Sequence, residues 1–168
     1  MISLHRRDAT THRHPSRAQT PASPRVPHPR HHRLLTRPIA IVSIVDTDRI
    51  WFKSRHGLDV EQIERGPGLC SSAILQRQPW VVTDAAADPR TLVNPLVAGE
   101  FGLRFYAGVP LTTHDGHNLG ILCVIDYQPR EVTADEVATL TDLAGLTMDE
   151  LEIRRAAREH RWAGVRPA

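Results

Sequence analysis

The stretch Leu103–Tyr127, LRFYAGVPLTTHDGHNLGILCVIDY, decides the fold of this chain. Apolar residues occupy every second position of its first arm, and Pro110 is expected to close that arm. The second arm, Leu119–Ile125, is almost continuously apolar. Asp115-Gly116 between them suits the positive φ angles of a hairpin turn. A hairpin with two apolar arms needs cover on both faces, so the rest of the chain should supply more strands and helices that pack on a sheet.

Two further strands are predicted ahead of this hairpin. Ile39–Asp46, IAIVSIVD, is rich in β-branched residues, and Ile50–Gly57 follows it after a polar turn. This spacing predicts a second antiparallel pair, in which Trp51 and Phe52 point to opposite faces. Leu58–Ile63 is expected to be a loop or a short extended piece.

Helical patterns lie on both sides of the hairpin in the sequence. Leu69–Gln76 has small and apolar residues at helical spacing, and Pro79 is expected to end that helix. The short strand Trp80–Thr83 then leads into a loop with two prolines. Thr133 opens the pattern Thr-Ala-Asp-Glu, a capping box for a helix of about 25 residues. The apolar stripe of that helix consists of Val137, Leu140, Ala144, Thr147 and Leu151.

This order of elements predicts an α+β domain over residues 39–155, with an antiparallel sheet and helices packed on it. Residues 156–168 are assigned to the end of the last helix and a tail. Residues 1–38 hold eight arginines, six histidines and six prolines with few large apolar side chains. We predict a disordered tail there, because such a composition buries too little apolar surface to offset the cost of ordering.

Charge is distributed unevenly along the chain. Residues 1–38 contain eight arginines and one acidic residue, which leaves 13 of the 21 basic and 18 of the 19 acidic residues for the folded part. That part is mildly acidic, which argues against nucleic-acid binding. The tail could suggest a histidine metal site, a transit peptide or weak contact with polyanions. A solvated tail is the favoured interpretation, because a flexible chain has no fixed ligand geometry.

The chain has two cysteines, Cys70 and Cys123, which are too few for a secreted disulfide scaffold. No apolar N-terminal run indicates a signal peptide, and no stretch approaches the ~20 apolar residues of a spanning helix. These features predict a cytoplasmic protein with reduced thiols and no membrane segment.

Five segments in a fixed order resemble a known family. These are IAIVSIVDTDRIWFKSRHGL, GLCSSAI, WVVTDAAADPRTLVNPLV, LRFYAGVPL and LGILCVID. Together they are similar to a bacterial GAF domain over residues 39–155. The resemblance implies a PAS-like twisted antiparallel sheet, with a ligand pocket on one face, helices on the other, and a long C-terminal helix. It also implies a sensory module of signal transduction that binds an unidentified small molecule, without enzymatic activity or a cofactor.

The N-terminus departs from the family pattern. GAF domains usually begin with a long helix that packs beside the last helix, whereas the corresponding positions here hold the proline-rich tail, which cannot form it. Either the domain is truncated, or residues 1–38 are not the family's own sequence. The missing helix is expected to leave part of one sheet face uncovered.

Cys70 is the first candidate site residue. It follows Gly66-Pro67-Gly68 at the expected first turn of a helix, where the helix dipole would lower the pKa of its thiol. Free methionine sulfoxide reductases, which have the GAF fold, carry a cysteine at a similar position. They also need cysteines in the loop that corresponds to residues 84–101, and this chain has none there. Cys70 and Cys123 therefore remain redox candidates, and a structural role for each is favoured.

The loop TDAAADPRTLVNPLV is expected to cover the pocket as a lid. Its polar residues Asp84, Asp88, Arg90 and Asn94 are ligand-binding candidates together with Cys70, although capping and turn roles are ordinary for such residues. Two more candidates, Arg104 and Tyr106, share a strand face. Arg104 is expected either to hold an anion or to pair with an acid such as Glu100.

Motifs for other kinds of ligand and cofactor are absent from the part of the sequence that is predicted to fold. The sequence shows no cyclic-nucleotide motif of the family, no bilin cysteine, no histidine placed for haem and no metal-spaced cluster. The last helix is a candidate homodimer surface that would pass a signal to a separate output protein. Three interpretations stay open: a stand-alone sensor, a thiol enzyme of the methionine sulfoxide reductase type that uses Cys70, and a truncated remnant without function.

Overall fold

The computed structural model describes residues 39–163. The predicted disordered tail, with the positions expected to lack the family's first helix, therefore lies outside the described residues. Six strands and three helices follow one another along the chain. They are β1 (Ile39–Val45), β2 (Arg49–His56), β3 (Gln62–Glu64), α1 (Leu69–Ala73), β4 (Trp80–Val82), α2 (Pro95–Ala98), β5 (Phe105–Thr112), β6 (Asn118–Asp126) and α3 (Ala134–Ala163).

All six strands form one antiparallel sheet in the order β3-β2-β1-β6-β5-β4. β1 and β6 lie at its centre and pair from Ile39 opposite Ile125 to Ile44 opposite Gly120. The predicted β1–β2 pair is confirmed, and Trp51 is 41% exposed while Phe52 is 4% exposed, as expected for opposite faces. The α+β fold class predicted from the sequence is therefore confirmed.

The predicted hairpin is β5–β6, whose turn contains Gly116 at a φ of +86°. One detail of the prediction is wrong: Pro110 does not close the first arm, because β5 continues to Thr112. β4 pairs with β5 only as far as Gly108. Pro110 thus lies beyond the paired part of β4, on the edge of the sheet, where a residue without an N–H group is tolerated.

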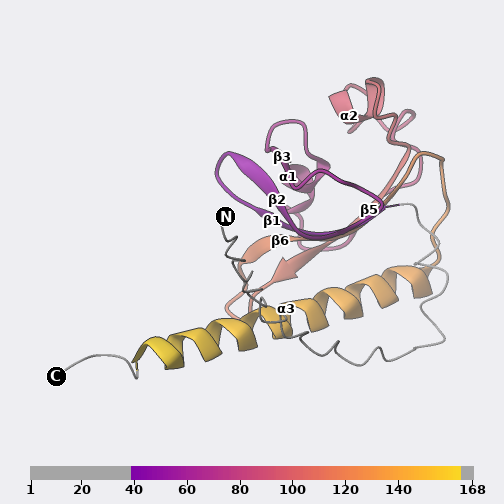
Figure 1. The fold of residues 1–168 in the computed structure, drawn as a ribbon. Helices are drawn as coiled ribbons and strands as arrows, with labels where there is room; N and C mark the ends of the chain where they lie inside the picture. The colour runs from indigo at the N-terminus through magenta and orange to yellow at the C-terminus, as the bar shows by residue number, and fades with distance from the viewer. Residues whose placement is uncertain (1–38, 164–168) are drawn as a thin grey trace, which may run out of the picture.

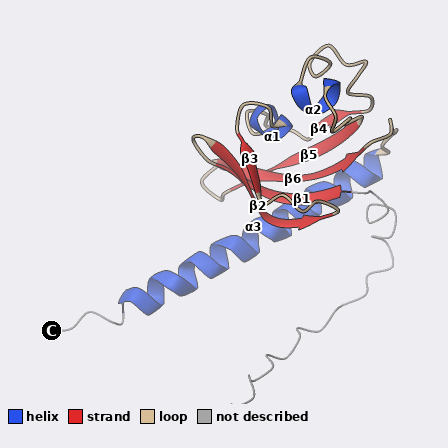
Figure 2. Ribbon diagram, turned by 45° about the horizontal axis from the view of Figure 1, so that its top comes forward, coloured by secondary structure: helices blue, strands red, loops and turns tan. Residues whose placement is uncertain are grey.

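The sheet separates two apolar layers (Figures 1 and 2). α3 covers one face, where it packs on Phe105, Ala107 and Val109 of β5. α1, α2 and the loops around them lie over the other face, which contains Tyr106 of the same strand. The period of two along β5 therefore divides its side chains between a helix-packed layer and a layer that belongs to the candidate site.

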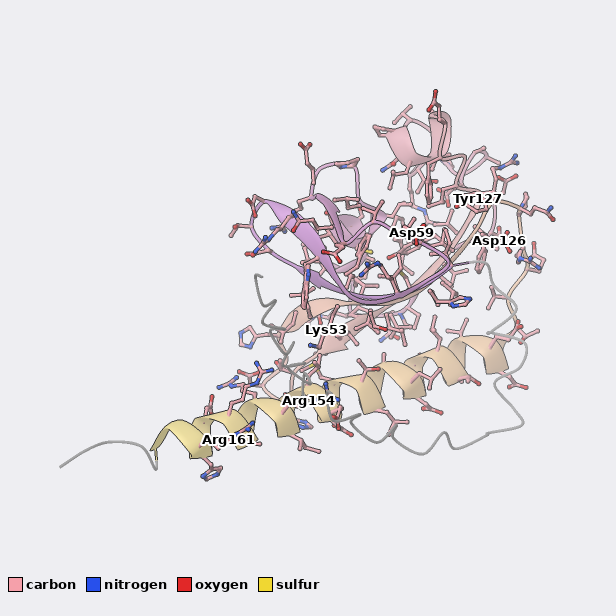
Figure 3. All side chains as sticks on the ribbon, viewed as in Figure 1. Lys53, Asp59, Asp126, Tyr127, Arg154 and Arg161 are labelled. Carbon is pink, nitrogen blue, oxygen red and sulfur yellow. The ribbon has the colours of Figure 1, made fainter. Side chains whose placement is uncertain are left out.

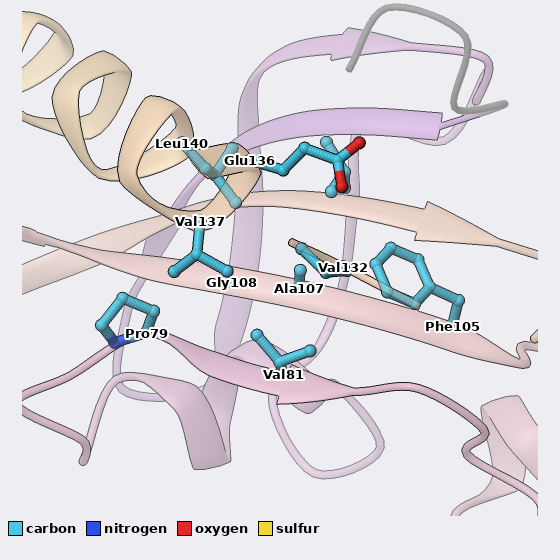
Figure 4. A pocket seen from close by; sticks show the side chains of 10 residues that line it. Pro79, Val81, Phe105, Ala107, Gly108, Val132, Glu136, Val137 and Leu140 are labelled. Carbon is cyan, nitrogen blue, oxygen red and sulfur yellow. The ribbon is translucent and has the colours of Figure 1, made fainter. Parts of the chain in front are cut away.

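α3 begins with the predicted capping box. The Thr133 hydroxyl accepts from the Glu136 backbone N–H at 3.2 Å, and the Glu136 carboxylate accepts from the Thr133 N–H at 3.0 Å. Close to this end, Val137 and Leu140 pack against β4 and β5 and leave a space of only about 10 Å³ (Figure 4). The interface is closely packed, so it is not a ligand site.

α3 spans 30 residues, which is longer than predicted. Leu140, Ala144 and Met148 are buried against the sheet, whereas residues 153–161 are exposed. Near the C-terminal end of α3, Arg154 lies beneath Lys53 of β2, and the last turns, with Arg161, extend past the sheet (Figure 3). Among the described residues, no helix is long and apolar enough to cross a lipid bilayer.

The helix predicted at Leu69–Gln76 is shorter than expected, because α1 ends at Ala73. The Asn118 side-chain amide donates to the carbonyl oxygens of Ile74 and Gln76 at 2.8 and 3.0 Å. In a longer helix these two carbonyl oxygens would accept from backbone N–H groups of the next turn, and here the Asn118 side chain takes the place of those donors. The contact comes from β6, 42 residues or more away in sequence, so local helix propensity could not reveal it.

Candidate functional site

A cavity of about 240 Å³ lies between the sheet and the segments that cover it. Its floor is formed by side chains of β1, β2, β5 and β6, and its walls by α1, the β2–β3 connection and the lid. Leu96 of the predicted lid and Phe101, four residues beyond the end of that lid, both contribute to the lining, so this loop does cover the cavity. The lining residues are Ile41, Phe52, Leu58, Val60, Ile63, Gly68, Leu69, Cys70, Leu96, Phe101, Leu103, Tyr106 and Ile125.

Two lining side chains carry polar atoms, and they contact each other. The Tyr106 hydroxyl donates to the Cys70 Sγ at 3.5 Å, and both residues are buried. Directly behind Cys70, the Cys123 Sγ lies 4.0 Å from the Cys70 Sγ. Ser43 completes this cluster and donates to the Ile121 carbonyl oxygen at 3.1 Å. The cavity is therefore an apolar chamber with a small polar cluster at its base.

Two neighbours fix the Tyr106 ring in place. Gly108 follows two residues later on the same face of β5, and a Cβ atom there would lie 2.5 Å from the Tyr106 hydroxyl oxygen. Trp80, which is paired with Gly108 across β4–β5, packs on the Tyr106 ring with centroids 5.4 Å apart. The glycine leaves room for the tyrosine to lie along the strand toward α1.

Burial and hydrogen bonding give the two thiols different acidities. When the Cys70 thiol ionises, the Cys123 S–H and the Tyr106 O–H can both donate to it, and these bonds, with a smaller contribution from Ser43, lower the pKa of Cys70 to about 7 although burial opposes the shift. The same contact with Cys70, together with burial, raises the pKa of Cys123 above its ordinary value. Burial raises the pKa of Tyr106, so its hydroxyl remains a donor. Cys70 is therefore the thiol of this pair that ionises first.

The predicted reason for an acidic Cys70 is incomplete. α1 has five residues, and its N-cap, Gly68, makes no side-chain capping bond. The donors that the structure shows at Cys70 come from β5 and β6 across the cavity floor. These contacts are the main causes of the lowered pKa, and Ser43 and the backbone at Cys70 make smaller contributions.

The lid is attached to the sheet by an ion pair. Arg104 donates to both carboxylate oxygens of Asp84 through its Nε and Nη2 atoms, each at 2.9 Å. This hydrogen bonding lowers the pKa of Asp84 and raises that of Arg104. Arg104 thus pairs with an acid, one of the two predicted alternatives, but the acid is Asp84 and not the suggested Glu100. Arg104 does not line the cavity with Tyr106, because it lies just before β5, beside the start of the lid.

The other polar lid residues also hold the lid together. The Asp88 carboxylate accepts from the Arg90 side chain, which lowers its pKa, and Arg90 lies over the Trp80 ring at 5.4 Å. The Asn94 side chain caps α2 at Leu96 N–H and donates to the Pro67 carbonyl oxygen at 3.0 Å. These residues keep the lid in shape around the cavity and do not line it.

Of the seven predicted ligand-binding candidates, Cys70 and Tyr106 line the cavity. Sequence reasoning missed the apolar residues that line the cavity from this region, which are Leu96 within LVNPLV and Phe101 after it. It also missed Thr91, which is 1% exposed and whose hydroxyl donates to the Ala85 carbonyl oxygen at 2.8 Å. A threonine in a polar loop gives no signal of burial, so only the folded lid identifies it.

Within residues 39–163, no group of three or more His, Cys, Asp or Glu side chains could hold a metal ion. The histidines of the hairpin turn contact carboxylates instead: His114 Nε2 lies 2.7 Å from Glu152 Oε2 of α3. The contact ties the turn to the helix.

Comparison with known proteins identifies the fold. The sequence model of the GAF domain matches residues 31–151. Among solved structures, a free methionine-R-sulfoxide reductase of Neisseria meningitidis, crystallised with its substrate, has a TM-score of 0.60 at 22% identity. The alignment covers 76% of this chain and 74% of that chain. A domain described as part of a two-component sensor histidine kinase of Sinorhizobium meliloti has a TM-score of 0.59 at 18% identity, covering 77% and 89% of the two chains.

A nearer sequence relative is a cyclic di-GMP phosphodiesterase of Pseudomonas aeruginosa. It is 47% identical to this chain over 120 residues, which are 71% of this chain and 20% of that enzyme. The chain therefore spans about a fifth of the length of the curated relative that it matches.

Proposed function

This chain belongs to the GAF domain family, and on that premise we propose that it is a sensory module of signal transduction that binds a small, mainly apolar molecule beneath its lid. The observation that carries this proposal is the cavity of about 240 Å³ with the Cys70–Tyr106 pair at its base. An apolar chamber with a few convergent polar groups is the usual form of a small-molecule site.

The lining selects the class of ligand. It contains no charged side chain, so a phosphate or carboxylate would be buried there without a partner, at a large desolvation cost. The volume is also slightly below the ~300–1,000 Å³ of common ligand sites. We infer a neutral ligand smaller than a nucleotide, which places one polar atom near Tyr106 or Cys70. Cyclic di-GMP does not fit this chamber.

A thermal melt of the full chain tests this proposal, with indole and n-octanol as neutral probes and cyclic di-GMP as a charged one. A neutral probe should raise the melting temperature, because a ligand at 100 times its Kd adds about 2.7 kcal/mol to the free energy of unfolding. Ile125→Phe fills the floor of the cavity and should abolish this rise. Leu119→Phe, on the same strand but outside the cavity, is the matched control and should keep it.

Two results would contradict the proposal. One is stabilisation by cyclic di-GMP and not by either neutral probe. The other is an equal rise in both variants, which would place the probe outside the cavity.

A reductase is the second candidate function, and Cys70 in the cavity wall is the observation that favours it. The uncharged lining opposes it, because free methionine sulfoxide carries an ammonium and a carboxylate. Turnover of free methionine sulfoxide with a thiol reductant, lost in Cys70→Ser, would establish this activity in place of the sensor function.

We also propose that α3 forms a homodimer and transmits the signal to an output protein or domain. Leu146 and Ile153, seven residues apart on α3, are 65% and 64% exposed, which supports a helix–helix contact. Replacing both with Glu should convert a dimer to a monomer in sedimentation, whereas Ala138→Glu on α3 should not. An unchanged mass for the double variant would refute this interface.

The two buried, free cysteines support a location in the reducing cytoplasm. There a thiol pair is reduced at rest, and its oxidation, when it occurs, is transient.

A further inference from the structure

We propose that Cys70 and Cys123 form a reversible disulfide at the base of the cavity when a small hydroperoxide enters it. The module would then respond to peroxide as well as to its ligand. Disulfide formation itself does not depend on the proposed ligand.

The geometry of the two thiols carries this inference. Their Sγ atoms are 4.0 Å apart, although one lies in α1 and the other in β6, 53 residues further along. A disulfide requires a separation of about 2.05 Å, so the sulfurs must approach by about 2 Å. α1 is a single turn of five residues, and it can adjust more easily than the central strand β6.

The cavity gives the two thiols different access. Cys70 lines the cavity, whereas Cys123 is fully buried behind it. A space of about 240 Å³ admits a hydroperoxide, which then meets Cys70 first. Cys70 is accordingly the attacking thiol and Cys123 the resolving one.

The acidity of Cys70 agrees with its assignment as the attacking thiol. At pH 7 a thiol with the pKa of Cys70, about 7, is about half ionised, whereas a thiol at the ordinary 9.0 is about 1% ionised. The thiolate is the form that reacts with peroxide. The Tyr106 hydroxyl, which donates to the same sulfur, holds the negative charge in place.

The reaction has two balanced steps. The Cys70 thiolate attacks one peroxide oxygen, the O–O bond breaks, and the released hydroxide takes a proton to form water, which leaves a sulfenic acid on Cys70. The Cys123 thiol then loses its proton and attacks the Cys70 sulfur. The S–O bond breaks, and the second water leaves with that proton. Two thiols and one hydrogen peroxide thus give one disulfide and two waters, and a dithiol reductant reverses the change.

The first step also prepares the second. The hydrogen bond to Cys70 is the largest cause of the raised pKa of Cys123, followed by burial and then by the charge of Cys70. A neutral sulfenic acid no longer places a negative charge beside that sulfur, so Cys123 ionises more easily once Cys70 has been oxidised.

The disulfide has a consequence for the cavity that does rest on the proposed function. It would join α1, a wall of the cavity, to β6, its floor, and convert the thiolate that accepts from Tyr106 into a neutral and weakly accepting disulfide sulfur. The freed hydroxyl would turn toward the ligand space. Oxidation should therefore change the affinity for a bound molecule.

The test treats the reduced full chain with hydrogen peroxide, alkylates it under denaturing conditions and measures its mass with peptide mapping. The expected product is a monomer that has lost two hydrogen atoms, with Cys70 linked to Cys123 and recovered by dithiothreitol. Cys123→Ser should stop at the sulfenic acid on Cys70, which dimedone captures. Cys70→Ser cannot form the internal disulfide, and its remaining thiol, Cys123, should react with peroxide roughly 50-fold more slowly if the thiolate fraction alone decides the rate. A thermal melt of each variant establishes that it is folded.

Three results would overturn the proposal. The first is two unmodified thiols at a peroxide dose that oxidises free glutathione. The second is a sulfinic acid on Cys70 with Cys123 still free. The third is a disulfide between two chains in place of the internal one.

The indole melt separates this proposal from the proposed function. If neither indole nor n-octanol stabilises either form but the disulfide appears, the ligand site is refuted and the disulfide stands. If indole stabilises both forms equally, the effect of oxidation on binding is refuted and the disulfide again stands.

Discussion

Gly108 makes room for Tyr106: a Cβ atom at position 108 would lie 2.5 Å from the Tyr106 hydroxyl oxygen and 2.8 Å from its ring. Both residues lie on the cavity face of β5. The hydroxyl reaches Cys70 because this space is empty. The absence of a side chain at position 108 therefore lets the Tyr106 hydroxyl reach the base of the cavity, whose lining comes from several segments that are distant in sequence.

Gly108→Ala should destabilise the protein by about 1–3 kcal/mol, because the fully buried tyrosine must move and the surrounding core is overpacked. Denaturant unfolding measures this change. Gly145→Ala is the matched control: nothing lies within 4 Å of a Cβ there, so it should stabilise α3 by about 0.5–1 kcal/mol. Equal effects at the two positions would contradict the tight contact at Gly108.

The pH at which the Cys70 thiol ionises should depend on the hydrogen bonds that it receives from Cys123 and Tyr106. The rate of its alkylation by iodoacetamide should rise with pH with a midpoint of about 7. Cys123→Ala removes the stronger donor and should move the midpoint upward, and Tyr106→Phe should move it upward by less. A midpoint that stays near 7 in both variants would mean that hydrogen bonding does not set this acidity.

Asp84→Asn should lower stability in a pH-dependent way. Arg104 lowers the pKa of Asp84 in the folded state below its ordinary 3.8, so the pair stabilises the fold above that pH. The contribution is lost as the pH falls through the lowered pKa. Melting temperatures of wild type and variant should therefore differ at neutral pH and converge in acid.

The control for that experiment is Asp59→Asn, which changes an exposed carboxylate outside the lid. It should not reproduce the loss at neutral pH. A constant difference between wild type and Asp84→Asn down to strongly acidic pH would show that the ion pair is not its cause.

Leu140→Ala should cost about 2–5 kcal/mol, because Leu140 is 3% exposed between α3 and the sheet. Leu75→Ala removes the same atoms from a residue that is 77% exposed, and it should change stability by less than about 0.5 kcal/mol. Urea unfolding of both variants checks this contrast. A small loss at Leu140 would mean that α3 is not docked on the sheet in solution.

Local patterns predicted most of the secondary structure. The Asp-Gly turn, the alternation along β5, the opposite faces of Trp51 and Phe52 and the capping box at Thr133 each depend on residues a few positions apart. The errors came from distant contacts. α1 is shorter than predicted, and the Asn118 side chain donates to the carbonyl oxygen that follows its last residue. Pro110 is tolerated within β5 because the short strand β4 does not pair with that part of β5.

The site was less predictable than the fold. Cys70 and Tyr106 were recognised separately, but the polar lid residues were expected near a ligand and instead bond to one another or to the sheet. A carboxylate before a loop looks the same in sequence whether it meets a ligand or an arginine. Which partner it finds depends on how the lid closes.

By itself the sequence determined the α+β class, the hairpin at the centre of the chain and the long capped helix, because these follow from apolar periodicity and turn chemistry along adjacent residues. Only the tertiary structure decided that Cys70, Tyr106 and Cys123 meet at the base of one apolar cavity. Their contact requires β6 to pair with both β1 and β5, and α1 to lie across that face of the sheet. Strand order and the packing of a crossing segment are properties of the whole chain, and no local pattern encodes them.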